Sequence, residues 1–145
     1  MPVRALPSEL LKHRLDYFAR MLHGVEHGEM RSVHRARVAS RRLRELVPAL
    51  RLRHDVSRKL ARRLRHLTIQ LGTLRELDVL MGLTDEMQQS RPDLSRALQR
   101  LGLEISKRRD DARKRLFDDL PVSQMWRLAR RLERVCEELR IDEET

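Results

Sequence analysis

Apolar residues recur every three or four positions along most of the chain, and no stretch alternates apolar and polar residues as a half-buried strand does. The clearest row is Leu60, Leu64, Leu67 and Leu71, whose spacing keeps one face of a helix apolar. Five glycines and five prolines separate such segments. The pattern therefore predicts an all-α protein.

The breaks divide the chain into about five or six helices joined by short turns. Ser8 is the expected N-cap of a first helix that ends near residue 28. The others are expected at about residues 30–47, 55–71, 73–89, 92–119 and 122–140, with Pro48 ending the second and Gly72 interrupting the third. Residues 141–145 are acidic, and we expect them to be disordered. Short turns between long amphipathic helices favour one antiparallel bundle over residues 1–145.

Charge makes this bundle a candidate for binding polyanions. The formal net charge is +10, and 28 of the 32 cationic side chains are arginine. The planar guanidinium group can donate two parallel hydrogen bonds to a phosphate, which the lysine ammonium cannot. A GC-rich genome would also favour arginine codons, so the placement of the arginines is more informative than their number.

The segment Val33–Arg44, VHRARVASRRLR, places cations along one edge of a predicted helix. At 100° per residue, the apolar face is bordered by a row made of His34, Arg37, Arg41 and Arg44. Like charges four residues apart repel one another by a few tenths of a kcal/mol, and Glu45 is the one acid placed to offset them. The row predicts an anionic ligand. Acids on a neighbouring helix, or a solvated arginine face, remain alternatives.

Other predicted helices also carry cations at the margins of their apolar faces. These are Arg14, Lys59, Arg63, Arg108 and Arg109. Together with the row above they could line a basic surface groove. Alternatively, each long side chain could cover apolar surface and reach water at its tip.

A second notable segment is Leu71–Leu80, LGTLRELDVL. Asp78 falls near the apolar row, and Arg75 lies three residues before it, so the two could form a local ion pair. A buried carboxylate must be paired or hydrogen-bonded. We therefore expect Asp78 to form a structural ion pair with an arginine, and we favour this over a catalytic role.

The sequence carries no indication of an enzyme. It lacks a phosphate-cradling glycine loop, a nucleophile elbow and a repeated acidic cluster for Mg²⁺. His23 and His27 have the spacing of a metal-binding pair, but no third ligand is evident, so no metal or cofactor is predicted. With one cysteine, no signal peptide evident and no run of roughly 20 apolar residues, a cytoplasmic location is expected.

Two segments resemble the CHAD family, the conserved histidine α-helical domain. Val33–Arg44 matches the pattern V-H-x-x-R-V-x-x-R-R-L-R at every fixed position, and Leu71–Val79 matches L-G-x-x-R-D-x-D-V except at Glu76. The resemblance covers about residues 29–120. It implies a helical bundle with a basic central surface that binds inorganic polyphosphate and is often found with polyphosphate granules. General nucleic-acid binding is the alternative, but the chain has only four aromatic residues for stacking bases.

The expected polyphosphate ligands combine both segments with the marginal cations. They are His34, Arg37, Arg41, Arg42, Arg44, Lys59, Arg63, Arg75, Arg108, Arg109 and Arg14. The full family domain has two related bundles and about twice this length, so this chain resembles one bundle with half of the basic channel. A homodimer would rebuild the channel. The apolar seam of the last helix, residues 125–139, could serve as its interface or could instead complete the chain's own bundle.

Overall fold

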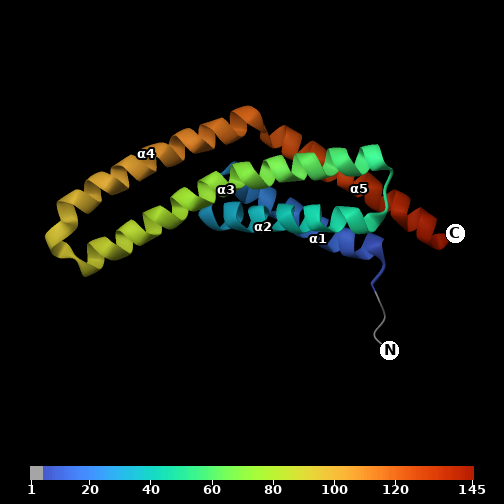
Figure 1. Cartoon of the computed structure of the whole chain (residues 1–145), viewed down its shortest axis with the longest axis horizontal. Coiled ribbons are helices and arrows are strands. Elements are labelled where there is room, and N and C mark those ends of the chain that lie inside the picture. Colours follow the sequence, from blue (N-terminus) through green and yellow to red (C-terminus); the bar gives the residue numbers. More distant parts are fainter. Residues whose placement is uncertain (1–4) are drawn as a thin grey trace.

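The computed structural model describes residues 5–145 and is built from five long helices joined by short turns (Figure 1). The helices are α1 (Pro7–Glu26), α2 (Met30–Leu46), α3 (His54–Ser90), α4 (Ser95–Asp119) and α5 (Val122–Glu144), with 3₁₀ turns η1 (Val47–Leu50) and η2 (Pro92–Leu94). Residues 5–145 contain no strand. The prediction of an all-α helical bundle is confirmed.

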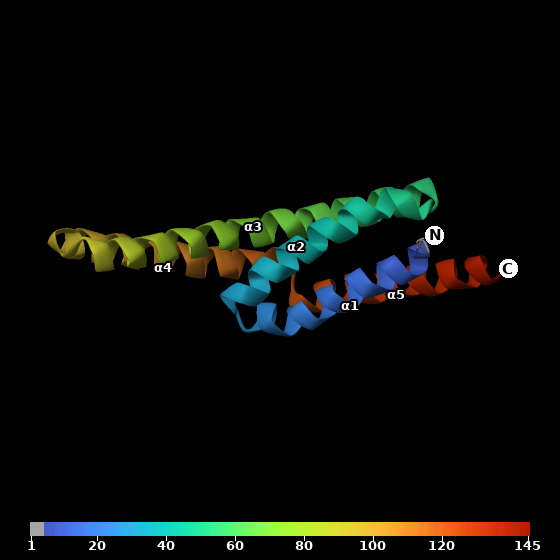
Figure 2. The ribbon, with the colours of Figure 1, turned by 90° about the horizontal axis from the view of Figure 1, so that it is seen from below.

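The five helices form a four-helix bundle with a long extension. Figures 1 and 2 show α1 beside α2 and α5, and α2 beside the first part of α3. Beyond the α1–α2 turn, where α2 begins, α3 continues outward, and the chain turns at η2 and returns along it as α4. We call this extension, residues 76–108, the hairpin. The bundle and the hairpin therefore share the single helix α3.

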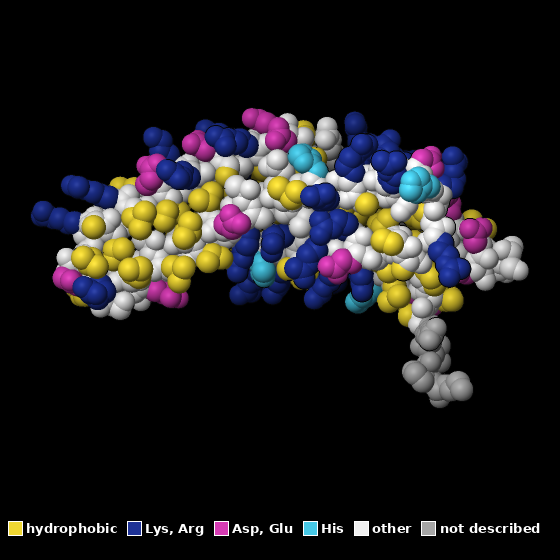
Figure 3. Space-filling view, in the orientation of Figure 1, with side chains coloured by type: hydrophobic (Ala, Val, Ile, Leu, Met, Phe, Trp, Pro, Cys, Tyr) yellow, Lys and Arg dark blue, Asp and Glu magenta, His cyan; other side chains and the backbone are white. Residues whose placement is uncertain are grey.

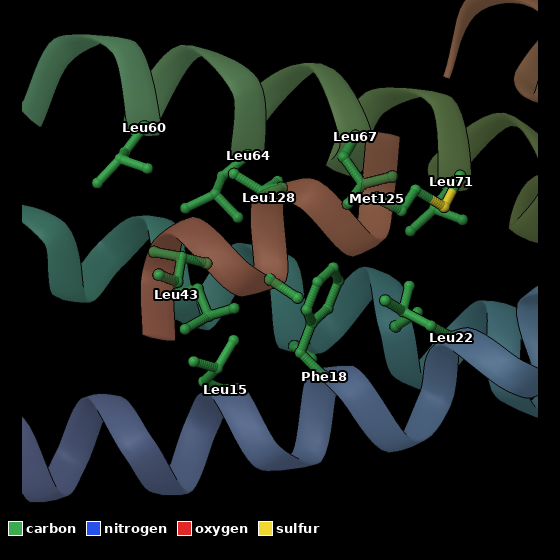
Figure 4. Close-up of a cluster of buried hydrophobic side chains, with 14 of the residues drawn as sticks. Leu15, Phe18, Leu22, Leu43, Leu60, Leu64, Leu67, Leu71, Met125 and Leu128 are labelled. Carbon is green, nitrogen blue, oxygen red and sulfur yellow. The ribbon is translucent and has the colours of Figure 1, made fainter. Parts of the chain in front are cut away.

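A continuous apolar core holds the bundle together (Figure 4). Phe18 of α1, Leu43 of α2 and Leu64 of α3 are each 0% exposed. Burying one such side chain contributes about 1.5–3 kcal/mol. The apolar seam of α5 packs into the same core through Met125, Leu132 and its neighbours. The seam thus completes the chain's own bundle, which was one of the two predicted alternatives.

The turns explain how the helices reverse direction. Gly28, between α1 and α2, has a φ of 70°, in the left-handed region that glycine adopts without strain. Pro48 lies in η1 just after α2 ends at Leu46, as a residue that removes a helical N–H should. Arg51 then takes a φ of 52° before α3 begins. These short reversals keep α1, α2 and α3 antiparallel.

Three predicted helix boundaries were wrong. Gly72 does not interrupt α3, which runs unbroken for 37 residues. Leu71 and Leu74, on either side of this glycine in the sequence, are both buried in the core and hold the helix there. Ser8 is not the N-cap of α1. Leu6 takes that position, and Ser8 donates through its backbone N–H and its hydroxyl to the Glu143 carboxylate. That contact helps to keep α5 helical to Glu144, whereas residues 141–145 had been expected to be disordered.

A buried ion pair joins the hairpin to the bundle. Nε of Arg109, on α4, donates to Oδ1 of Asp78, on α3, whose side chain is only 2% exposed. A second nitrogen of Arg109 donates to the Gly28 carbonyl in the α1–α2 turn at 3.1 Å. The predicted structural pairing of Asp78 is therefore present, but its partner is Arg109 and not Arg75. A residue 31 positions away reaches Asp78 because α4 folds back along α3.

Candidate anion-binding site

The edge of α2 that carries the predicted row faces α3 over most of its length. The apolar face of α2, which includes Val33, Ala36 and Leu43, is buried in the core. The cationic positions next to this face therefore lie along the contact with α3. The Ser40 hydroxyl lies 2.8 Å from that of Thr68 and fixes the antiparallel register of the two helices. The α2/α3 seam is defined here as the cations along this contact: His34, Arg37, Arg44, Arg58, Lys59, Arg62, Arg65 and Arg75.

At one end of the seam, a histidine lies among arginines. Burial, followed by the charges of Arg75, Arg37 and Arg35, lowers the pKa of His34 below its ordinary value. Nδ1 of His34 and Nε of Arg37 are buried and have no hydrogen-bond partner among residues 5–145. The local field is therefore strongly positive and would stabilise an anion placed beside it.

Gly72 makes the close approach of α2 to α3 possible at this end. A Cβ atom at position 72 would lie 3.3 Å from Nε of Arg37, tighter than an ordinary van der Waals contact. Glycine therefore leaves room for the Arg37 side chain to pass over α3. The two segments that resemble the CHAD family meet here, since Arg37 belongs to the first and Gly72 to the second.

At the other end of the seam, cations line an open hollow of about 580 Å³. The lining residues are Arg44, Asp55, Arg58, Lys59, Ala61, Arg62 and Arg65. Asp55 is the one acid in this lining. It pairs at 3.4 Å with Arg53, which does not line the hollow. The cations of the seam form no ion pair among the described residues. Figure 3 shows dark blue side chains gathered over α2 and the adjoining part of α3.

The structure brings together five of the predicted ligands and separates the others. The seam contains His34, Arg37, Arg44, Lys59 and Arg75. Arg41 remains on the edge of α2 but lies 3.5 Å from Glu45 in an exposed ion pair.

The remaining predicted ligands lie elsewhere. Arg14 donates to the backbone carbonyl of Arg42 at 3.0 Å, and the side chain of Arg42 is exposed. Arg63 lies on the α5 side of α3. Arg108 pairs with Glu104 on the hairpin at 3.4 Å, and Arg109 is held by Asp78. We therefore leave Arg109 out of the ligand set, because its guanidinium group already has acceptors inside the fold.

Three seam residues were missed from the sequence: Arg58, Arg62 and Arg65. They are spaced four and three residues apart beside the leucine row of α3. The predicted row on α2 has the same kind of spacing beside its apolar face. Lys59 and Arg63 lie beside this second row on α3. The spacing of this row could be read from the sequence. Which of the cations on α3 lie beside α2, however, depends on which side of α3 packs against α2.

The donor set of the seam suits binding of oxyanions. Guanidinium groups donate but never accept, and they cannot act as proton-transfer groups near neutral pH. Within residues 5–145, no group of three or more His, Cys, Asp or Glu side chains is arranged to hold a metal ion. No helix in the described part of the chain is long and apolar enough to cross a membrane.

Comparison with known proteins identifies one family. A family model described as the CHAD domain matches residues 9–144, extending beyond the region of the two sequence segments in both directions. No curated protein and no solved structure matches the chain.

Proposed function

Because the chain belongs to the CHAD family, we propose that it binds inorganic polyphosphate along the α2/α3 seam and does so without catalysing a reaction. The observation that carries this proposal is a row of unpaired cations on each of two facing helices, with Asp55 as the one acid between them. Uncompensated repulsion within such rows is relieved by an anionic ligand that runs along them.

A linear phosphate chain matches the geometry of the seam. Cations one helical turn apart repeat at about 5.4 Å along the axis, so successive turns can contact phosphates at intervals along one chain. Each guanidinium can donate two hydrogen bonds to one phosphate. At the His34 end, an anion would also lie beside the buried, unpartnered nitrogens of His34 and Arg37. Binding should weaken steeply with salt, because each neutralised phosphate releases counterions.

Nucleic-acid binding is the competing proposal, and the aromatic residues disfavour it. Phe18 is fully buried, and Tyr17, Phe117 and Trp126 pack against the core. Bases of single-stranded nucleic acid need exposed aromatic faces for stacking. A filter assay should compare long polyphosphate with single-stranded DNA at equal total charge and moderate salt. We expect polyphosphate to displace the DNA, and displacement in the opposite direction would favour the nucleic-acid proposal.

The seam itself can be tested by neutralising two of its cations. Replacing Arg37→Gln and Arg75→Gln removes hydrogen bonds to charged groups, each contributing about 1.5–3 kcal/mol. We expect polyphosphate affinity to fall by at least about tenfold. A matched control, Lys114→Gln with Arg115→Gln, removes the same charge from exposed positions of α4 outside the seam. Equal losses in both variants would show that only net charge matters.

We also propose that two copies associate, through the hairpin and not through α5. Large apolar side chains on the hairpin are exposed: Val79, Leu80, Leu83, Met87, Leu94, Leu101 and Leu103. Figure 3 shows a yellow area over the hairpin, at one end of the molecule. All charged side chains of residues 76–90 in α3 are acidic, whereas most charged side chains of residues 96–108 in α4 are basic. An antiparallel pair would place the acidic edge of each hairpin against the basic edge of the other.

Sedimentation velocity tests the association. Leu83→Glu should convert a dimer into a monomer, because it places a charge in the apolar contact. Ile141→Glu is the matched control, since Ile141 is 58% exposed at the far end of α5. A wild-type protein that stays monomeric at all concentrations would contradict the proposal.

In cells, we expect the protein to colocalise with polyphosphate granules in the cytoplasm, and fluorescent tagging would check this.

A further inference from the structure

A second basic hollow lies on the opposite side of α3, where α3 faces α5. Two adjoining hollows of about 510 and 720 Å³ share Arg63 and Arg127 in their linings. The arginines of the lining are Arg62, Arg63, Arg127, Arg130, Arg131 and Arg134. We call this continuous feature the α3/α5 groove.

Regular helix spacing creates the basic wall of the groove. On α5, Arg127, Arg131 and Arg134 are spaced four and three residues apart beside the buried apolar face of that helix. The opposite wall, on α3, contributes Arg63 and its neighbours. Cations therefore border an apolar floor on both sides, as along α2. The contact region on α3 spans Val56 to Leu67, or roughly 16 Å at the rise of an α-helix.

Four of the groove cations lack a counter-charge. Arg62, Arg63, Arg127 and Arg131 make no ion pair or side-chain hydrogen bond among residues 5–145. Among the described residues outside the groove, five exposed arginines do pair with a local acid, as Arg91 does with Asp93 and Arg140 with Glu137. Glu138 is the one acid in the lining, and it lies at the end of the groove near Arg134. The part around Arg63 and Arg127 is therefore open to an anion.

One arginine connects this groove to the α2/α3 seam. Arg62 lines the hollow at the Arg44 end of the seam and also lines the α3/α5 groove. It is exposed on the surface of α3 between the two features. An extended anion could therefore pass from one side of α3 to the other while remaining beside cations throughout.

We infer that the α3/α5 groove is a second anion-binding site, and that one long polyphosphate chain occupies both it and the α2/α3 seam by crossing α3 at Arg62. This inference rests on the proposed function. Short phosphate chains would occupy the two sites separately. A long chain bound at one site is held near the other at a high effective concentration, so its affinity exceeds that of either site alone.

Isothermal titration with tripolyphosphate distinguishes the two sites. We expect two bound molecules per chain for the wild type. The groove variant, Arg127→Gln with Arg131→Gln, and the seam variant, Arg37→Gln with Arg75→Gln, should each bind one. The control, Lys114→Gln with Arg115→Gln, should bind two, because these exposed residues of α4 line neither feature.

Long polyphosphate provides the second measurement. Its affinity for the groove variant should fall at least about tenfold below that for the control, because the bridging contribution is lost. Unchanged stoichiometry and affinity in the groove variant would overturn this inference while leaving the proposed function in place. No binding by the wild type would overturn both. If single-stranded DNA of equal charge lost as much affinity as polyphosphate, the assignment of a phosphate chain to the groove would be overturned.

Discussion

Helix α3 passes through two different environments, and the contrast between them is informative. In the bundle, Leu60, Leu64 and Leu71 are 0% exposed. In the hairpin, the same helix carries Val79, Leu80 and Leu83 at 42–51% exposure. Both halves have helically spaced apolar residues, but only the first is enclosed by α1, α2 and α5. An apolar stripe therefore identifies a helix and the face that can be buried, while burial itself depends on how many neighbours reach that face.

The charges of the two regions differ as well. Around the bundle, the cations of the α2/α3 seam and the α3/α5 groove have almost no acidic partners. Where the hairpin begins, Arg109 is held by Asp78 and by the Gly28 carbonyl. Arginine is thus found in two settings in this chain: paired at the junction of the hairpin and the bundle, and unpaired along the seam and the groove, where it makes the surface basic.

The largest expected effect is on the packing contrast along α3. Leu64→Ala should lower the free energy of unfolding by about 2–5 kcal/mol, because it removes a fully enclosed side chain and leaves a cavity. Leu83→Ala, at an exposed hairpin position, should change it by less than about 0.5 kcal/mol in the monomer. Urea denaturation at low protein concentration measures both. Similar losses for the two variants would mean that the hairpin face is enclosed in solution.

Breaking the ion pair at the junction should have the next largest effect. Asp78→Ala leaves the Arg109 guanidinium, 21% exposed, without its counter-charge, and we expect a loss of about 3 kcal/mol. Replacing both residues, Asp78→Leu with Arg109→Met, should recover most of it. Hydrogen exchange should localise the damage to the hairpin and the α1–α2 turn. A loss spread evenly over all five helices would contradict a role specific to the junction.

Much of this architecture could be predicted from the sequence, and the failures share one physical cause. Local spacing was sufficient for the helices and for the cationic edge of α2. Long-range contacts were not accessible in this way. The pairing of Asp78 with Arg109 depends on α4 folding back, and α5 stays helical to Glu144 partly through a contact with Ser8. The missed row of Arg58, Arg62 and Arg65 likewise required the position of α2 on α3.

A smaller effect is expected at Gly72, where stability and binding should change in opposite directions. Alanine is favoured over glycine inside a helix by roughly 0.5–1 kcal/mol. Its Cβ would lie 3.3 Å from Nε of Arg37, so that side chain must shift by a few tenths of an ångström. We expect Gly72→Ala to keep or slightly raise the unfolding free energy and to weaken polyphosphate binding several-fold. Gly82→Ala is the control, since nothing lies within 4 Å of a Cβ there. Equal affinity in both variants would show that Arg37 adapts freely.

The smallest expected effect is a pH dependence from His34. Burial and the charges of Arg75, Arg37 and Arg35 hold the pKa of His34 below its ordinary value near 6.5. In the free protein, the unfolded chain therefore binds a proton more readily than the folded one. Stability contributed by neutral His34 is complete above about pH 6.5 and declines as the pH falls below it.

Binding should show the opposite trend with pH. A bound phosphate chain supplies the negative charge that the imidazolium form of His34 lacks, so it raises the pKa of His34 and promotes proton uptake. Affinity for polyphosphate should thus rise a few-fold as the pH falls from about 8 to 6. His34→Gln should remove this component and leave whatever part comes from the ligand. Parallel pH profiles for the two proteins, measured by anisotropy of labelled polyphosphate, would exclude His34 from the site and leave the seam to its arginines.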